Sequence, residues 1–237
     1  MQNLPFSIQV SPEVTARYPT YRALVLVAKH LQNSPSTPFT DQLLAEVEAD
    51  IRQRFDLAAF KAHPHMQAWR EAYRLFGVKP QKLQNSAEAL ITRVLKGQNL
   101  PRINLLVDLY NAISVRHVLP SGGEDLSQVE GEVCLKFASG TEPFDTVKDG
   151  QHIIEYPQQG EVVWIDARGV TCRAWNWRQG TRTRLTEQAT SAYFLLDHLL
   201  PEGPLELQKA GAELIELLQK VCPEVQISKQ WLGVESL

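Results

Sequence analysis

The stretch PRINLLVDLYNAISVRHVLPSGGEDL, residues 101–126, decides the fold, because a helical pattern runs directly into a pair of glycines. Asn104, Asp108 and Asn111 stand at i, i+4 and i+7, so we expect them to share one face of a helix. Asn and Asp are poor helix formers that compete for local backbone hydrogen bonds, so three of them on one helix face indicate a specific structural or functional role. It predicts either a pocket wall that binds hydroxyls or an ammonium group, or a buried polar network that ties the helix to a loop.

The glycines that follow this helix, Gly122 and Gly123, have two readings. They let backbone N–H groups approach a ligand closely, or they form a turn with positive φ. The segment matches neither G-x-G-x-x-G nor G-x-x-x-x-G-K-[ST], so no loop for nucleotide phosphates is expected. A plain turn is the favoured reading.

Upstream of this stretch, two strands precede a run of helices. Residues 6–10 and the apolar run 23–28 predict strands, and the second should be buried on both faces. Amphipathic helices are expected after the loop SPSTPFT, and their ends have recognisable residues, with Thr40 and Ser86 as N-caps and Gly77 and Gly97 as C-terminal stops.

Downstream, the chain changes to short segments rich in β-formers and separated by turn residues. These are EVCLKFA, HIIEY, EVVWID, GVTCRAWNW and SAYFLLDHL, followed by the amphipathic helix PLELQKAGAELIELLQKV. Helices in the first half and strands in the second predict an α+β fold, a compact mixed α/β unit. With no internal repeat and no clear linker, we expect residues 1–237 to form a single domain.

The segment WNWRQG, residues 175–180, lies in a positive region, because residues 167–186 contain five arginines and no acidic residue. Extended backbone would place Arg173, Trp175 and Trp177 on one side and Asn176 and Arg178 on the other. Interleaved Arg and Trp suit stacking on a base or an amino-acid ring. The alternative is a tryptophan core with arginines stacked on its rim.

Composition excludes several classes of protein. With 43% hydrophobic residues, 22% charged residues and a net charge of −3, the chain is an ordinary globular protein, and extensive wrapping by nucleic acid is disfavoured. Its three cysteines and six histidines form no metal-ligand spacing, and no serine elbow is present. Neither MQNLPFSIQV nor any later segment reads as a signal or membrane span, so we expect a cytoplasmic protein.

Two long segments, RLFGVKPQ to PSGGEDL (residues 74–126) and GEVVWIDARGVTCRAWNWRQGTRTRLTEQAT (residues 160–190), closely resemble a known family. They look like the freestanding relatives of the B-three/B-four tRNA-editing module in the β subunit of phenylalanyl-tRNA synthetase. The resemblance covers about residues 12–218, and the order and spacing of its segments make it specific. The anticodon-binding, catalytic and aminoacylation segments of a synthetase are not visible, so the chain would not charge tRNA itself.

The resemblance implies a compact fold with an editing pocket at the junction of its two halves. In the synthetase, that module removes tyrosine wrongly attached to the phenylalanine tRNA. Asn111 then corresponds to an asparagine on the helix that lines the pocket. Gly122 stands where the synthetase has a pocket histidine, and RTRLTEQAT offers Thr or Arg where it has a pocket glutamate.

Editing of this type resembles substrate-assisted chemistry, in which a ribose hydroxyl and a positioned water supply the attack and the pocket supplies orientation and backbone donors. The expected catalytic residues are Asn111, Gly122, Gly123 and Asn176. The expected substrate-binding residues are Asn104, Asp108, Arg173, Trp177, Arg178, Gln179 and Arg182.

The leading hypothesis is therefore a protein that binds the aminoacylated 3′ end of tRNA and hydrolyses a mischarged aminoacyl ester in trans, releasing free amino acid. Such a protein is an aminoacyl-tRNA deacylase and not a complete tRNA ligase, and we expect no cofactor, metal or membrane partner. One alternative is a non-catalytic module that binds RNA or an amino-acid-like molecule. Another is a protein interaction domain with a tryptophan core. The convergence of Asn111, Gly122 and Asn176 on one open cavity would separate these hypotheses.

Overall fold

Residues 6–233 are described by the structure, a computed structural model, so residues 1–5 and 234–237 of the expected domain lie outside this range. The helices are α1 (Pro12–Arg17), α2 (Pro38–Arg54), α3 (Leu57–Lys61), α4 (Pro64–Leu75), α5 (Ser86–Leu95), α6 (Leu105–His117) and α7 (Gly203–Val221). The strands are β1 (Ile8–Val10), β2 (Arg22–Lys29), β3 (Ser121–Asp125), β4 (Val133–Phe137), β5 (Phe144–Lys148), β6 (Gln151–Glu155), β7 (Val162–Asp166), β8 (Gly169–Arg173), β9 (Arg178–Gln179), β10 (Ser191–His198) and β11 (Gln226–Leu232).

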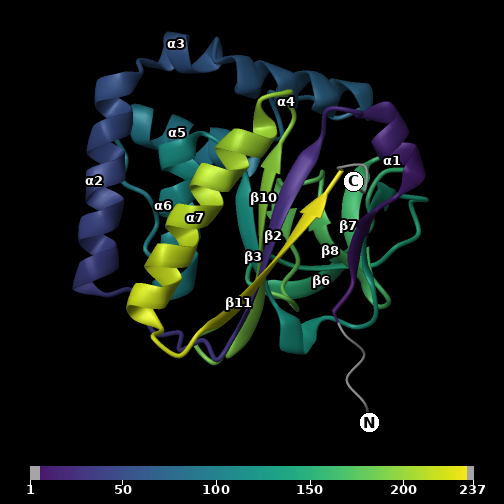
Figure 1. The fold of residues 1–237 in the computed structure, drawn as a ribbon. Helices are drawn as coiled ribbons and strands as arrows, with labels where there is room; N and C mark the ends of the chain where they lie inside the picture. Colours follow the sequence, from purple (N-terminus) through teal and green to yellow (C-terminus); the bar gives the residue numbers. More distant parts are fainter. Residues whose placement is uncertain (1–5, 234–237) are drawn as a thin grey trace.

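The strands form two main sheets and a separate hairpin. One sheet has the order β1-β4-β7-β8-β9, the other has the order β11-β2-β10-β3, and β5 pairs with β6. Only the β1 and β4 pairing is parallel among the named strands. Helix α7 crosses the near face of the second sheet, while α3 and α4 run along one end of the molecule (Figure 1). This arrangement confirms the expected α+β class.

Side chains of the second sheet alternate between a face that packs against α7 and the opposite face. Phe194 and Leu196 of β10 pair with Leu26 and Leu24 of β2 and share their face. A Cβ atom on Gly211 of α7 would collide with the Leu24 side chain, so glycine is needed for this close packing. The intervening residues of β10 therefore point to the opposite face of the sheet.

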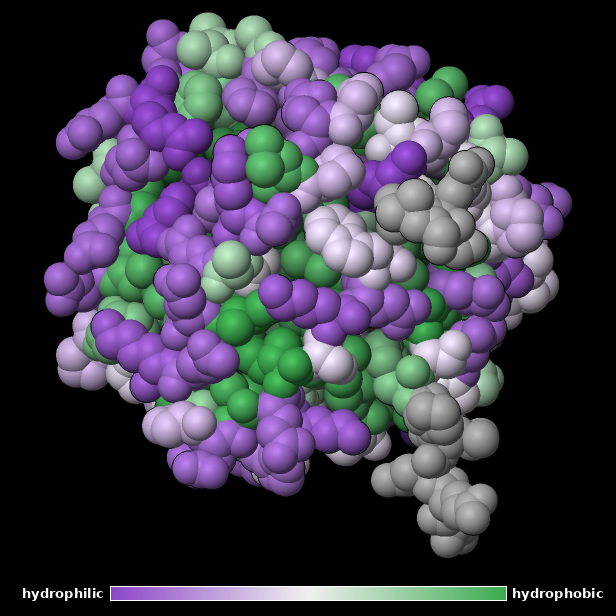
Figure 2. Space-filling view, in the orientation of Figure 1, coloured by the Kyte–Doolittle hydropathy of each residue, from purple (hydrophilic) through white to green (hydrophobic). Residues whose placement is uncertain are grey.

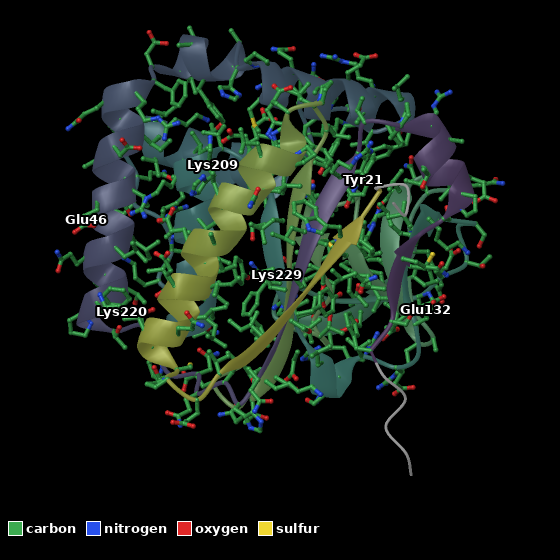
Figure 3. The ribbon with its side chains drawn as sticks, in the orientation of Figure 1. Tyr21, Glu46, Glu132, Lys209, Lys220 and Lys229 are labelled. Carbon is green, nitrogen blue, oxygen red and sulfur yellow. The ribbon has the colours of Figure 1, made fainter. Side chains whose placement is uncertain are left out.

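The near side of the molecule is polar at its surface. Hydrophilic residues cover most of this face, and hydrophobic residues show mainly between the regions of α7 and β11 (Figure 2). Lys209 and Lys220 extend from α7, and Lys229 extends from β11 (Figure 3). A binding cavity is therefore more readily formed behind the second sheet than on this solvated face.

Helix starts differ from the expected N-caps by one to three residues. Thr37 caps α2 and exchanges hydrogen bonds with Thr40, so Thr40 is the third residue of the helix. Asn85, not Ser86, caps α5 by accepting from Glu88 N at 2.9 Å. Both expected caps were wrong because a neighbouring polar residue also accepts well at an N-cap.

The glycine pair is not a turn, which corrects the favoured reading of LPSGGEDL. Residues 121–125 form β3, in which Gly123 pairs with Phe194 and Gly122 with Leu195. A Cβ atom on Gly123 would lie 2.9 Å from Phe194 Cδ1 and from Leu185 Cδ1. The glycine thus serves close packing, and the strand is defined by its pairing with β10.

Trp175 belongs to the core. It is fully buried, and its ring centroid lies 4.9 Å from that of Tyr18, 4.9 Å from that of Tyr21 and 5.2 Å from that of Trp69. The chain does not pass through it as extended backbone, because Ala174 and Trp175 have φ values of 43° and 65°. Residues 174–177 form the turn between β8 and β9, so the expected two-sided alternation was wrong there.

No helix between residues 6 and 233 combines the length and the apolar character that crossing a bilayer requires.

Candidate functional site

A partly open cavity of about 300 Å³ lies where the two main sheets meet. Its walls come from both sheets, through β3 and β10 of one and β7, β8 and β9 of the other, and from α5 and α6. Its volume is at the lower end of the range of small-molecule pockets, about 300–1,000 Å³. The cavity can hold a ligand of the size of an amino acid with adjoining groups.

Asn111, Gly122 and Asn176 converge on this one cavity. They come from α6, from β3 and from the turn after β8, which are far apart in the sequence. Four further residues of the expected site lie in the same wall, namely Gly123, Trp177, Arg178 and Gln179. The cavity thus has the composition that the sequence favoured, with amide groups, a guanidinium and aromatic rings.

Strand alternation decides which atoms of β3 and β10 reach the cavity. Tyr193, Leu195 and Asp197 point away from α7 and line the cavity. Gly122 pairs with Leu195 and so shares that face, where a Cβ atom would have no neighbour within 4 Å. Its missing side chain therefore leaves free volume inside the site.

The turn of residues 174–177 positions Asn176. Its Nδ2 donates to Asp197 Oδ2 at 3.0 Å, and its Oδ1 accepts from Tyr73 Oη at 3.0 Å. Asp197 Oδ1 accepts from Tyr21 Oη at 2.6 Å. Burial raises the pKa of the Asp197 carboxyl to about 6, against the opposing effect of these two donors. The network holds Asn176 rigidly and leaves one N–H of its amide for a ligand.

Asn111 and Gln179 are held differently. Gln179 Nε2 donates to the carbonyl of Gly123 at 2.7 Å, which leaves its Oε1 as an acceptor. The Asn111 side chain has no hydrogen bond to any residue in the described part of the chain. It is therefore available to a ligand at the cavity wall.

The other two residues of the expected Asn and Asp stripe lie outside the cavity. Asn104 is the N-cap of α6, where it accepts from Val107 N at 3.0 Å and donates to Leu185 O at 2.9 Å. Asp108 is fully buried and accepts from Ile103 N at 2.9 Å. Of the two readings, the buried network between helix and loop describes Asn104 and Asp108, and the pocket wall describes Asn111.

The arginine cluster is largely neutralised by acids that are distant in the sequence. Arg173 pairs with Glu161 at 2.9 Å and with Glu155 at 3.1 Å, and Arg182 pairs with buried Asp166 at 2.8 Å. Both guanidinium groups lie outside the main cavity, so the structure does not bring these two expected substrate-binding residues to it. The expected positive patch is correspondingly reduced.

Arg178 is the arginine that remains at the cavity. Its Nη2 donates to Val147 O at 3.0 Å, its guanidinium carbon lies 5.9 Å from the Trp177 ring centroid, and no acidic partner is found among residues 6–233. Its other N–H groups can donate to an anionic ligand.

Several cavity residues were not among the expected ones. They include Ser86, Tyr110, Glu124, Trp164, Cys172, Tyr193 and Asp197. Glu124 could have been found by period-two alternation from Gly122 if SGGED had been read as a strand. The tyrosines and Asp197 lie in segments that look like ordinary apolar structure, so only the tertiary fold brings them to the site.

Thiol chemistry finds little support at this site. Burial raises the pKa of the Cys172 thiol well above its ordinary value, which disfavours the nucleophilic thiolate. Within the described residues, no group of three or more His, Cys, Asp or Glu side chains could hold a metal ion.

Comparisons with known proteins extend these observations. The family model of the B3/4 domain matches residues 68–223. The chain is also similar to an N-terminal fragment of the phenylalanyl-tRNA synthetase β subunit from Pyrococcus horikoshii, with 9% identity and a TM-score of 0.46 over 97% of this chain and 51% of that one. The chain thus spans about half the length of that fragment, and no curated protein matches it in sequence. Because the family model covers more than half of its residues, the chain belongs to the B3/4 domain family.

Proposed function

We propose that this protein binds the aminoacylated 3′ end of a tRNA in the cytoplasm and hydrolyses a mischarged aminoacyl ester in trans. The convergence of Asn111, Gly122 and Asn176 on one cavity carries this proposal. The resemblance of residues 12–218 to a tRNA-editing module supports it, and we take that range as the extent of the module. Membership of the B3/4 domain family agrees with that resemblance.

In the proposed reaction, a water oxygen attacks the ester carbonyl carbon and forms a bond to it. The bond between that carbon and the ribose oxygen breaks, and the leaving oxygen takes up the proton that the water gives away. The products are free amino acid and tRNA with its terminal hydroxyl restored. A neighbouring ribose hydroxyl can relay this proton, so the protein need not supply a nucleophile.

The cavity residues would orient this reaction. Asn111 and the free N–H of Asn176 are candidates to donate to the carbonyl oxygen as it gains negative charge. Trp177 offers an aromatic ring for the terminal base, and Arg178 offers donors for its phosphate. Since one free arginine supplies few phosphate contacts, the affinity for tRNA should be modest and should fall with salt.

The test is deacylation of a panel of tRNAs, each charged with a wrong amino acid, including L-tyrosine and its D-enantiomer. The purified protein should release the amino acid from at least one member faster than buffer does, and correctly charged tRNAs should stay intact. Asn111→Ala should slow this release by about 100-fold, whereas Asn99→Ala, outside the cavity, should not. No release above buffer across the panel would exclude hydrolysis, and tRNA binding without turnover would instead support a binding module.

A further inference from the structure

Glu124 is an unusual side chain for the wall of a largely aromatic cavity. It belongs to β3, lines the cavity beside Gly122 and is only 6% exposed. Its Oε2 is buried and has no hydrogen-bond partner within residues 6–233. A buried carboxyl oxygen without a partner is costly, so its retention calls for a ligand that satisfies it.

No cation among residues 6–233 forms an ion pair with this carboxyl, although the charge of Arg182 lowers its pKa. Arg182 is held by Asp166, and Arg173 is held by Glu161 and Glu155. Arg178 donates to Val147 O. Of the charges that the cavity contains, Asp197 is also acidic and is already bonded to Tyr21 and Asn176. A cation that forms an ion pair with Glu124 would therefore have to come with a ligand.

The remaining walls suit an organic cation. The aromatic residues around the cavity are Tyr110, Trp164, Trp175, Trp177 and Tyr193. Faces of such rings attract an ammonium group, most strongly where water is excluded. A carboxylate together with aromatic walls is a common arrangement for recognising a primary amine.

We propose that Glu124 binds the ammonium group of the ligand, so that the cavity selects amino acids and aminoacyl esters with a free amino group. This inference rests on the proposed function for the class of ligand, and it adds the residue and the charge that recognise it. Glu124 is assigned here to binding, with no role in transferring the proton of the hydrolytic step.

The state of Glu124 before binding makes the proposal measurable. Burial raises the pKa of its carboxyl to about 8, so the empty site holds it mostly protonated at pH 7. Other titratable or charged groups lie near enough to interact electrostatically with this carboxyl or with its neighbours. They are Tyr110 of α6, Asp166 of β7, Cys172 of β8, Tyr193 of β10, Arg182 and Arg184. An ammonium group at Glu124 should favour the carboxylate and release about one proton on binding.

Titration calorimetry in two buffers of different ionisation enthalpy tests this directly. The probes are the L- and D-amino alcohols of alanine, leucine, phenylalanine and tyrosine, which stay cationic at neutral pH. Their controls are the matched diols, in which a hydroxyl replaces the ammonium group. At least one amino alcohol should bind about 10-fold to 100-fold more tightly than its diol, as a charged hydrogen bond implies, and should release about one proton at pH 7.

Glu124→Gln keeps the size of the side chain and removes its charge. It should abolish the proton release and bring the affinity of the amino alcohol down to that of the diol. Glu130→Gln is the matched control, because Glu130 is exposed and forms a surface ion pair with exposed Arg168. Thermal melting of each variant shows whether it is folded.

The outcomes separate this inference from the proposed function. Absence of binding by every probe, equal binding of amino alcohol and diol, or unchanged binding in Glu124→Gln overturns the role of Glu124 even if mischarged tRNA is hydrolysed. Selective binding with proton release upholds it even if no tRNA is hydrolysed, and then the cavity is an amine site without catalysis.

Discussion

Asn176 donates a hydrogen bond to Asp197 over 3.0 Å, and this bond joins the turn after β8 to β10 in the other main sheet. The cavity lies at this junction, so the same contact that holds the two sheets together also orients a side chain at the cavity wall. The stability of the fold and the geometry of the site are thereby coupled at Asn176.

Replacing Asn176 by alanine should impair both stability and activity. The change removes the hydrogen bonds that Asn176 makes with Asp197 Oδ2 and Tyr73 Oη. This loss should lower the unfolding free energy by about 1–3 kcal/mol. Denaturation in urea measures this loss. Wild-type stability in Asn176→Ala would show that the network contributes nothing to the junction.

Replacing Asn111 by alanine should separate the two effects. Asn111 has no side-chain hydrogen bond within the described part of the chain, and alanine favours the helix. The unfolding free energy should change by less than about 1 kcal/mol, whereas deacylation should fall by about 100-fold if the amide stabilises the developing oxyanion. Equal losses of stability in Asn111→Ala and Asn176→Ala would contradict this distinction.

Replacing the two tryptophans of WNWRQG should likewise separate an effect on stability from an effect on binding. Trp175 is fully buried among aromatic rings, so Trp175→Ala should lower the unfolding free energy by about 3–5 kcal/mol. Trp177 is half-buried at the cavity, so Trp177→Ala should mainly weaken the binding of tRNA. Urea denaturation and filter binding of tRNA distinguish the two. A severe loss of stability in Trp177→Ala alone would reverse the assignment.

Acid should destabilise the fold in part through His65. This ring is 2% exposed, stacks on His198 with centroids 3.8 Å apart, and accepts from Trp69 Nε1 at 2.9 Å. Burial lowers its pKa from 6.5 to about 3, so the unfolded chain takes up a proton at a higher pH than the folded one. Its contribution to stability is therefore complete above about pH 6.5 and is lost as the pH falls toward 3.

The measurement is the urea midpoint between pH 7.5 and pH 4. The fall with decreasing pH should be shallower in His65→Gln than in the wild type, and both proteins share the contributions of Glu124 and Asp197. His152→Gln serves as the control, since His152 is exposed. An identical slope in all three proteins would remove His65 from the acid response.

Clear periodicity made much of the fold predictable. The apolar spacing of α4 and α7 and the uninterrupted apolar runs of β2 and β10 are strong signals, and the structure confirms these elements. Short elements such as α3 and β5 lack such a signal. For SGGED, local preference favoured a turn, but pairing with β10 and the contact of Gly123 with Phe194 stabilise a strand.

The site was predictable only where nearby residues define it. Asn111, Gly122 and the segment 176–179 line the cavity. They could be predicted because each lies in a short stretch whose composition indicated recognition. The left-handed backbone at Ala174 and Trp175 is a feature that residue type does not specify. Likewise, the ion pair of Arg182 with Asp166 depends on tertiary contact.

Filling the cavity from Gly122 tests the central claim most directly. A leucine there would project into free volume from a strand with ordinary φ, so Gly122→Leu should fold normally while it blocks the ligand. Ala58→Leu, on the exposed side of α3, adds similar bulk elsewhere. In deacylation of the best mischarged tRNA, Gly122→Leu should be slower than the wild type by about 100-fold or more, and Ala58→Leu should match the wild type. Equal rates for the wild type and a folded Gly122→Leu protein would contradict the assignment of this cavity as the active site.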